Sequence, residues 1–148
     1  MNGRRLCKRM SGQRGATAVE FAIVAALLFT LLIGIMEFGR ILFYWNTATE
    51  ATRLGARIAV VCNKDDLEIK QKMREMLSFL TDDQISIQYD PAGCTIETCQ
   101  TVTVSIAPGV SISTVIPFVP ITPSLPAFST SLPRESMDSA GGTNPVCT

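Results

Sequence analysis

The sequence contains no histidine. Histidine is the commonest general base and metal ligand in proteins, so its absence removes the simplest hydrolytic and metal-dependent sites. There is also no Gly-x-Ser-x-Gly elbow and no phosphate-binding loop. The acidic pairs Asp65-Asp66 and Asp82-Asp83 lie at the ends of expected helices, where capping accounts for them. We therefore expect neither an enzyme activity nor a cofactor.

Acidic residues are absent from the start of the chain. Residues 1–15 are rich in Gly and Ser, and all of their charges are positive: Arg4, Arg5, Lys8, Arg9 and Arg14. All 13 acidic side chains follow this segment. The rest of the chain is therefore net acidic and offers no broad basic surface for nucleic acid. We expect residues 1–15 to form a basic leader peptide and the protein to have no nucleic-acid partner.

Charge is also absent between Phe21 and Met36. Together with the small residues before Glu20, this apolar segment approaches the roughly 20 residues that span a bilayer as a helix. The residues that follow, Glu37-Phe-Gly-Arg40, provide no small-residue cleavage site, so residues 16–38 are expected to remain as a membrane anchor. The basic flank predicts a cytoplasmic N-terminus and an extracytoplasmic C-terminal domain.

Small residues recur at every fourth position of the anchor: Ala18, Ala22, Ala26, Thr30 and Gly34. Such a row lets another membrane helix approach closely and is typical of helix packing in membranes. The alternative is that Ala and Gly are simply common in membrane helices. The sequence leaves both interpretations open.

The helical pattern continues without proline to Val61, with Tyr44 and Trp45 where an aromatic belt at the membrane surface would lie. We expect residues 39–62 to continue the helix as an amphipathic segment. Its apolar positions recur at intervals of three and four: Ala48, Ala51, Leu54, Gly55, Ile58, Ala59 and Val61. Glu50, Arg53 and Arg57 fall on another face, and Glu50 can pair with Arg53.

The remainder predicts a small α+β extracytoplasmic domain at residues 63–138, giving one long helix, one further helix and a few short antiparallel strands. The second helix is expected at 67–80, and strands at 85–89, 101–106, 110–116 and 128–132. Prolines after Ile106 favour edge strands or extended segments. Apolar residues among them, such as Val115 and Leu125, are expected to cover the helix or meet a partner subunit. Residues 139–148 are expected to form a flexible tail.

Four cysteines lie beyond the anchor, and Cys7 lies in the leader. In an oxidising compartment an even number of cysteines favours disulfides, and no metal site is expected. The simplest pairing joins Cys94 to Cys99 between two adjacent strands, which leaves Cys62 with Cys147. A zinc site using the Cys94 to Cys99 spacing is the alternative.

With Gly15, Glu20 and the apolar run in place, the chain resembles class III prepilins. The resemblance implies that a prepilin peptidase cuts after Gly15 on the cytoplasmic side, which makes Ala16 the new terminus and Glu20 the fifth residue. It also implies that Glu20 is paired with the new α-amino group, in the same chain or a neighbouring one. The alternative is that Glu20 lies at the headgroup level and contacts water.

A second block resembles the TadE-like minor pseudopilins of the tight-adherence (Flp-type) pilus machinery. It consists of Phe21, Glu37, Phe38, Gly39, Arg40, Asn46, Ala48, Ala51, Arg53, Gly55, Ala56 and Arg57. Thr52 stands where the family commonly has Ala. Glu37 and Arg40 can pair with each other or contact the membrane interface and other subunits. Arg53 and Arg57 can contact anionic lipid, another pilin or only solvent.

The resemblance implies a structural and assembly subunit in the biogenesis of a Flp-type type IVb pilus or a related secretion apparatus. Its partners would be the lipid bilayer, the prepilin peptidase, other pilins or pseudopilins and the inner-membrane pilus assembly proteins. It would be a single-pass protein of the bacterial inner membrane that can enter a surface pilus. The competing hypothesis is an uncleaved bitopic membrane protein whose extracytoplasmic domain is a protein-binding module.

Overall fold

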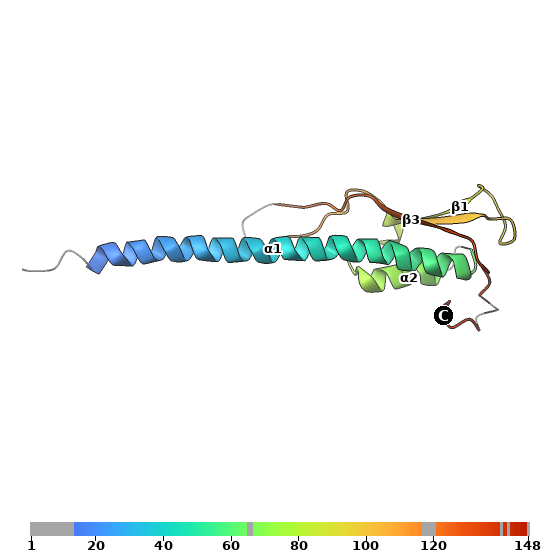
Figure 1. Ribbon diagram of the computed structural model, residues 1–148, viewed down its shortest axis with the longest axis horizontal. Helices are drawn as coiled ribbons and strands as arrows, with labels where there is room; N and C mark the ends of the chain where they lie inside the picture. Colours follow the sequence, from blue (N-terminus) through green and yellow to red (C-terminus); the bar gives the residue numbers. More distant parts are fainter. Residues whose placement is uncertain (1–13, 65–66, 117–120, 140, 142, 148) are drawn as a thin grey trace, which may run out of the picture. The chain divides into compact units, whose positions relative to one another are not determined.

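The computed structural model describes residues 14–64, 67–116, 121–139, 141 and 143–147. Its elements are α1 (Arg14–Val61), α2 (Leu67–Met76), the 3-10 helix η1 (Asp82–Gln84), β1 (Ile85–Asp90), β2 (Thr101–Ile106) and β3 (Phe128–Pro133) (Figure 1). This combination confirms the predicted α+β class. The chain forms two compact units, Met1–Phe38 and Gly39–Thr148. Helix α1 begins in the first unit and ends in the second, and most of the expected leader peptide lies outside the described residues.

The second half of α1 is the helix around which the outer unit, residues 39–148, is built. Of the apolar positions predicted for this helix, Ala48, Ala51 and Ala59 are fully buried and Ile58 is nearly so, whereas Leu54 and Val61 are half-buried. Ala56, which was not among them, is fully buried as well. Small side chains allow the other elements of this unit to approach the helix closely, and Figure 1 shows α2 beside this half of α1. The core therefore forms along one face of the helix.

Helix α2 is shorter than predicted and ends at Met76 instead of Leu80. Its apolar stripe continues into the turn that follows, where Leu77 and Leu80 are buried. In a continued helix, Phe79 would point away from the face that carries Leu77. The turn instead lets the Phe79 ring pack edge-on against Tyr44, with 5.2 Å between ring centroids. The residues expected to cap the start of α2, Asp65 and Asp66, lie outside the described residues.

Three antiparallel strands form one sheet in the order β1-β2-β3. Ile85 pairs with Ile106, and Thr101 pairs with Pro133, so the three strands are in register over their full length. Their side chains alternate as predicted: Val102, Val104 and Ile106 are buried, and the residues between them are half-exposed. Proline at the end of β3 is tolerated because β3 is an edge strand.

The strand predicted at 110–116 is not formed. The described part of this segment makes only an isolated antiparallel bridge, between Ser111 and Ser124. Two flanking backbone bonds, from Ile112 N–H to Pro123 C=O and from Leu125 N–H to Val110 C=O, are each 2.8 Å long. Prolines cannot donate to a ladder, and they punctuate both sides of this pairing. The predicted alternation nevertheless holds in part, since Val110 and Ile112 are buried. Leu125 is also buried, whereas Val115 and Ile121 are exposed.

The segment after β3, residues 134–139, forms what we call the C-terminal strap across the end of α1. The N–H groups of Glu135 and Met137 donate to the Val60 carbonyl at 3.2 and 3.1 Å, and that of Asp138 donates to Val61 at 2.8 Å. Helix ends leave such carbonyls without intrahelical partners, so the strap caps α1. Met137 adopts a left-handed backbone (φ 46°) and is fully buried.

Ser139, at the start of the expected flexible tail, is also fixed. Its hydroxyl accepts a hydrogen bond from the Asn63 N–H at 2.9 Å, and its own N–H donates to the Asn63 side chain at 3.2 Å. Cys147 is buried and bonded to Cys62. The described ends of this tail are therefore attached to the end of α1.

Candidate functional site on helix α1

The first half of α1 is apolar and open. Among the described residues, α1 alone, over Gly15–Val61, is long and apolar enough to cross a membrane by length and composition. Its most apolar 18-residue window has a mean hydropathy of 2.5, and none of that window is buried. Large side chains such as Phe21, Leu27 and Ile35 are mostly exposed. This half of the helix is compatible with a single-pass membrane protein.

The small-residue row of the anchor lies on this exposed half. Ala18, Ala22, Ala26 and Gly34 are all exposed, and the Thr30 hydroxyl donates to the Ala26 carbonyl at 2.8 Å within the helix. A Cβ added at Gly34 would meet nothing within 4 Å. The chain's own packing within the described residues therefore gives no reason for glycine at this position.

The residues of the predicted processing site lie at the very start of the described helix. Gly15 and Ala16 are in the first turn, exposed, and Glu20 is exposed one turn beyond Ala16. A Cβ at Gly15 would also meet open space. The site is therefore an accessible helix end with a carboxylate four residues further on.

Residues of the second family block divide into two groups, and the first group packs inward. Ala48, Ala51 and Ala56 are fully buried in the outer unit. Gly55 is buried between α2 and β2, where an added Cβ would be 2.6 Å from the Met73 sulfur and 3.2 Å from Cγ1 of Val104. These four residues are explained by the fold of the chain itself.

Arg40 also contributes to the fold of the outer unit. Its guanidinium donates to the Ser113 carbonyl and lies 5.5 Å above the ring centroid of Tyr44. These contacts hold Ser113 against α1, beside a cavity of about 300 Å³ that Arg40, Tyr44 and Ser113 line. Tyr44, predicted for an aromatic belt, is thus half-buried against Phe79, while Trp45 is exposed.

The remaining residues around Arg40 differ in exposure. Glu37 is only 5% exposed, whereas Phe38 is 63% exposed. A Cβ at Gly39 would meet nothing within 4 Å, so its small size is not required by its surroundings among the described residues. That Glu37 and Arg40 pair with each other, or contact the membrane interface and other subunits, remains a prediction.

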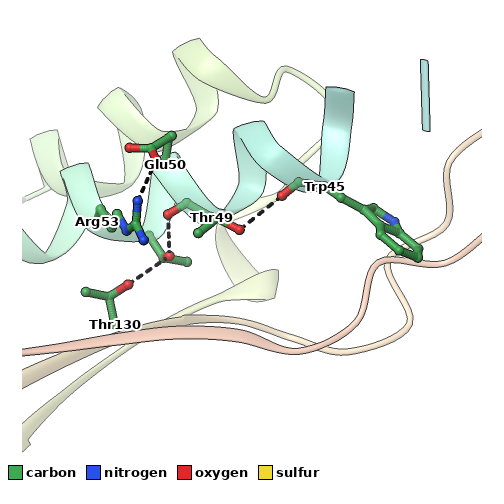
Figure 2. A network of polar contacts seen from close by, with 6 residues as sticks. Trp45, Thr49, Glu50, Arg53 and Thr130 are labelled. Carbon is green, nitrogen blue, oxygen red and sulfur yellow. Dashed lines mark hydrogen bonds and ion pairs between the residues drawn. The ribbon is translucent and has the colours of Figure 1, made fainter. Parts of the chain in front are cut away.

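The second group of the block points outward. Asn46, Arg53 and Arg57 are exposed and, with Glu50, follow each other at helical intervals of three and four. Figure 2 shows the ion pair from Arg53 to Glu50, which is 2.7 Å long and was predicted from their spacing. Arg57 has no ion-pair partner among the described residues. We call this row, 46, 50, 53 and 57, the outer stripe of α1.

Thr52 has a structural role that the sequence did not reveal. Its side chain is buried, donates to the Thr49 carbonyl at 2.9 Å and contacts the Thr130 hydroxyl of β3 at 3.0 Å (Figure 2). These two threonines are 78 positions apart, so no local pattern links them. The threonine that stands where the family commonly has Ala thereby connects α1 to the sheet.

The four outer cysteines form two disulfides, Cys62–Cys147 and Cys94–Cys99. Both pairs consume their thiols, so the alternative of a zinc site on the Cys94 to Cys99 spacing is wrong. The described residues contain no other group of His, Cys, Asp or Glu that could hold a metal ion.

Of three comparisons with known proteins, one gave a match, which lies on α1. No curated protein and no solved structure matches the chain. Residues 15–57 match the model of the family described as TadE-like protein. The match begins at the predicted processing site and ends at Arg57, so it covers the apolar half, the inward alanines and the outer stripe. This is a structural and assembly family, not one known for catalysis. Residues 15–57 are therefore similar to the TadE-like family, and this match is consistent with a TadE-like protein of the tight-adherence system.

Proposed function

We propose that the protein is a minor pseudopilin, an assembly subunit of a Flp-type type IVb pilus or a related secretion apparatus. The observation that carries the proposal is the Gly15 to Glu20 pattern at the head of an apolar, fully accessible helix half that matches the TadE-like family. The precursor is anchored in the bacterial inner membrane with its leader in the cytoplasm and its outer unit in the periplasm. A prepilin peptidase then removes the leader.

Leader removal changes the charge at the start of the helix. Hydrolysis of the Gly15–Ala16 peptide bond leaves a positive α-amino group on Ala16, four residues before Glu20 and thus about one helical turn away. An opposite charge at this distance favours an ionised carboxylate and offsets part of its desolvation in the bilayer. In an assembly, the amine of a neighbouring subunit can take the same role.

The contrast between two glycines supports assembly with other helices. Gly55 is small because α2 and β2 pack against it, whereas nothing among the described residues packs against Gly34. Small residues on an exposed membrane helix allow close approach of another such helix. We assign the row from Ala18 to Gly34 to packing against other pilins or pseudopilins, within the membrane or in a surface pilus.

The N-terminus of the protein recovered from membranes tests this function. Intact-mass measurement is expected to give a chain that begins at Ala16. Gly15→Leu should leave the precursor uncut, while the matched substitution Gly39→Leu on the same helix should be processed normally. A wild-type chain that retains Met1, so that it differs from the Gly15→Leu protein only by the mass of the substituted side chain, would favour the alternative of an uncleaved membrane protein with an outer binding module.

A further inference from the structure

The loop between β1 and β2 is a rigid, exposed projection of the outer unit. The Cys94–Cys99 disulfide closes it, and Thr95 and Thr98 hydrogen-bond inside it through N–H to Oγ1 at 2.8 Å. At its tip Ile96 is 43% exposed, an unusual position for an isoleucine, and Glu97 beside it is exposed. We call residues 94–99 the disulfide loop. It presents one apolar side chain and one carboxylate in a fixed arrangement.

A shallow hollow with the complementary chemistry lies where α1 and β3 end. Its volume is about 390 Å³, and its lining consists of Arg57, Val60, Val61, Leu132, Pro133 and Glu135. The walls are mainly aliphatic, with one charged residue of each sign, Arg57 and Glu135. Arg57 has no ion-pair partner among the described residues. An apolar side chain could pack against the aliphatic walls, and a carboxylate next to it could pair with Arg57.

Loop and hollow are neighbours on the protein. The Arg134 guanidinium donates to the Ile96 carbonyl, and the Arg134 N–H donates to the Gln100 carbonyl at 2.9 Å. Arg134 directly follows Pro133 of the hollow. Ile96 and Glu97 do not line the hollow of their own chain, so the two features remain unmatched within one molecule.

We propose that the outer unit forms a two-fold symmetric dimer in which the disulfide loop of each copy enters the hollow of the other. Because loop and hollow lie on adjacent parts of one surface, a two-fold axis can bring both pairs together at once, as an isologous interface requires. Ile96 is then buried against Val60, Val61 and Leu132, and Glu97 pairs with Arg57. The disulfide holds the loop in its bound shape, so little conformational entropy is lost on association.

This contact also explains why Arg57 faces outward and has no ion-pair partner among the residues that the structure describes. Within the outer stripe, Arg53 is engaged by Glu50, and Arg57 is the cation that a second molecule can reach. The proposal goes beyond the proposed function and depends on neither leader removal nor entry into a pilus.

Sedimentation of the full-length protein in detergent micelles, over a range of concentrations, tests the dimer. The wild type is expected to shift from monomer to a closed dimer. Glu97→Arg and Arg57→Glu should each weaken dimerisation by about tenfold or more, since each leaves like charges facing each other. Combining both reversals should restore most of the affinity, because the pair is re-formed with the signs exchanged.

Lys72→Glu is the matched control, a charge reversal at an ion-paired site on α2 that does not line the hollow. It should leave the dimer dissociation constant unchanged. Ile96→Asp should abolish the dimer, and because Ile96 is exposed in its loop, this change should not prevent folding. Circular dichroism confirms that each variant is folded. A wild type that stays monomeric, a double reversal no better than the single ones, or growth beyond the dimer would each overturn the proposal. Intact mass on the same samples reports leader removal separately.

Discussion

The backbone of Gly55 on α1 lies so close to Met73 on α2 that a Cβ added at Gly55 would be 2.6 Å from the Met73 sulfur. The same Cβ would be 3.2 Å from Cγ1 of Val104 on β2. One absent side chain therefore sets how closely both a helix and a strand approach α1.

Replacing Gly55 by leucine should destabilise the outer unit by about 2 to 3 kcal/mol, because the core has no room for the added atoms. Urea unfolding of the full-length protein in micelles measures the change. The control is Gly39→Leu, where the Cβ points into open space and the free energy of unfolding should change by no more than about 0.5 kcal/mol. In a Met73→Ala background the cost of Gly55→Leu should fall. An equal cost in both backgrounds would contradict the proposed contact.

The Thr52 and Thr130 hydroxyls form a pair whose energy can be measured by removing one or both. Thr52→Val should lower the free energy of unfolding by about 1 kcal/mol, since the Thr130 hydroxyl loses its partner next to the core. The double variant Thr52→Val with Thr130→Val should recover part of this loss, because no unpaired hydroxyl remains. Thr49→Val removes an exposed hydroxyl that bonds to Trp45 and should have little effect. Strict additivity of the two single changes would show that the hydroxyls do not interact.

The two disulfides should contribute unequally to stability. The Cys62–Cys147 bridge spans 85 positions and the Cys94–Cys99 bridge only 5. In the chain-entropy model, loops of these lengths correspond to about 4.5 and about 2 kcal/mol. Replacing both members of each pair by serine, followed by thermal unfolding, should therefore reveal a clearly larger loss for the first pair. Hydrogen exchange should also accelerate at the N–H groups of the strap, and unchanged exchange there would show that the strap holds without its bridge.

Glu20→Ala should separate processing from assembly. The peptidase cuts at Gly15, so leader removal is expected to remain largely intact, whereas incorporation into the pilus machinery should weaken because the new α-amino group loses its counter-charge. Immunoblots of membranes and sheared surface fractions measure the two steps. Glu50→Ala, which removes an exposed carboxylate further along the same helix, is the control. Normal piliation by the Glu20→Ala protein would refute the role of Glu20.

Periodicity predicted the elements whose pattern is local. The spacing of Ala48, Ala51 and Ala59 marked the buried face of α1, and alternation from Thr101 to Ile106 gave β2 its bounds. Helix α2 was predicted too long because an apolar stripe continues through Leu77 and Leu80 whether or not the backbone remains helical. The predicted strand at 110–116 failed because prolines in its surroundings prevent a continuous ladder.

The contacts between residues far apart in the chain could not be predicted from the sequence. The strap caps α1 through ordinary backbone groups at 135, 137 and 138, and such groups look alike at every position. The contact between Thr52 and Thr130 forms only when β3 packs against α1, so no local pattern in the sequence predicts it. For the candidate site, the family block lies on α1, but only the fold separates its inward residues, such as Gly55, from outward ones, such as Arg57.

The bridge between Cys62 and Cys147 has a mechanical consequence. It closes residues 62–147 into a covalent ring whose two ends meet directly after the last residue of α1. A load applied at the C-terminus, for example through a fused domain, would pass through the sulfur atoms directly into the helix. The sheet and α2 lie within this ring and would carry none of the load, so they would stay folded under tension as long as the bridge is intact.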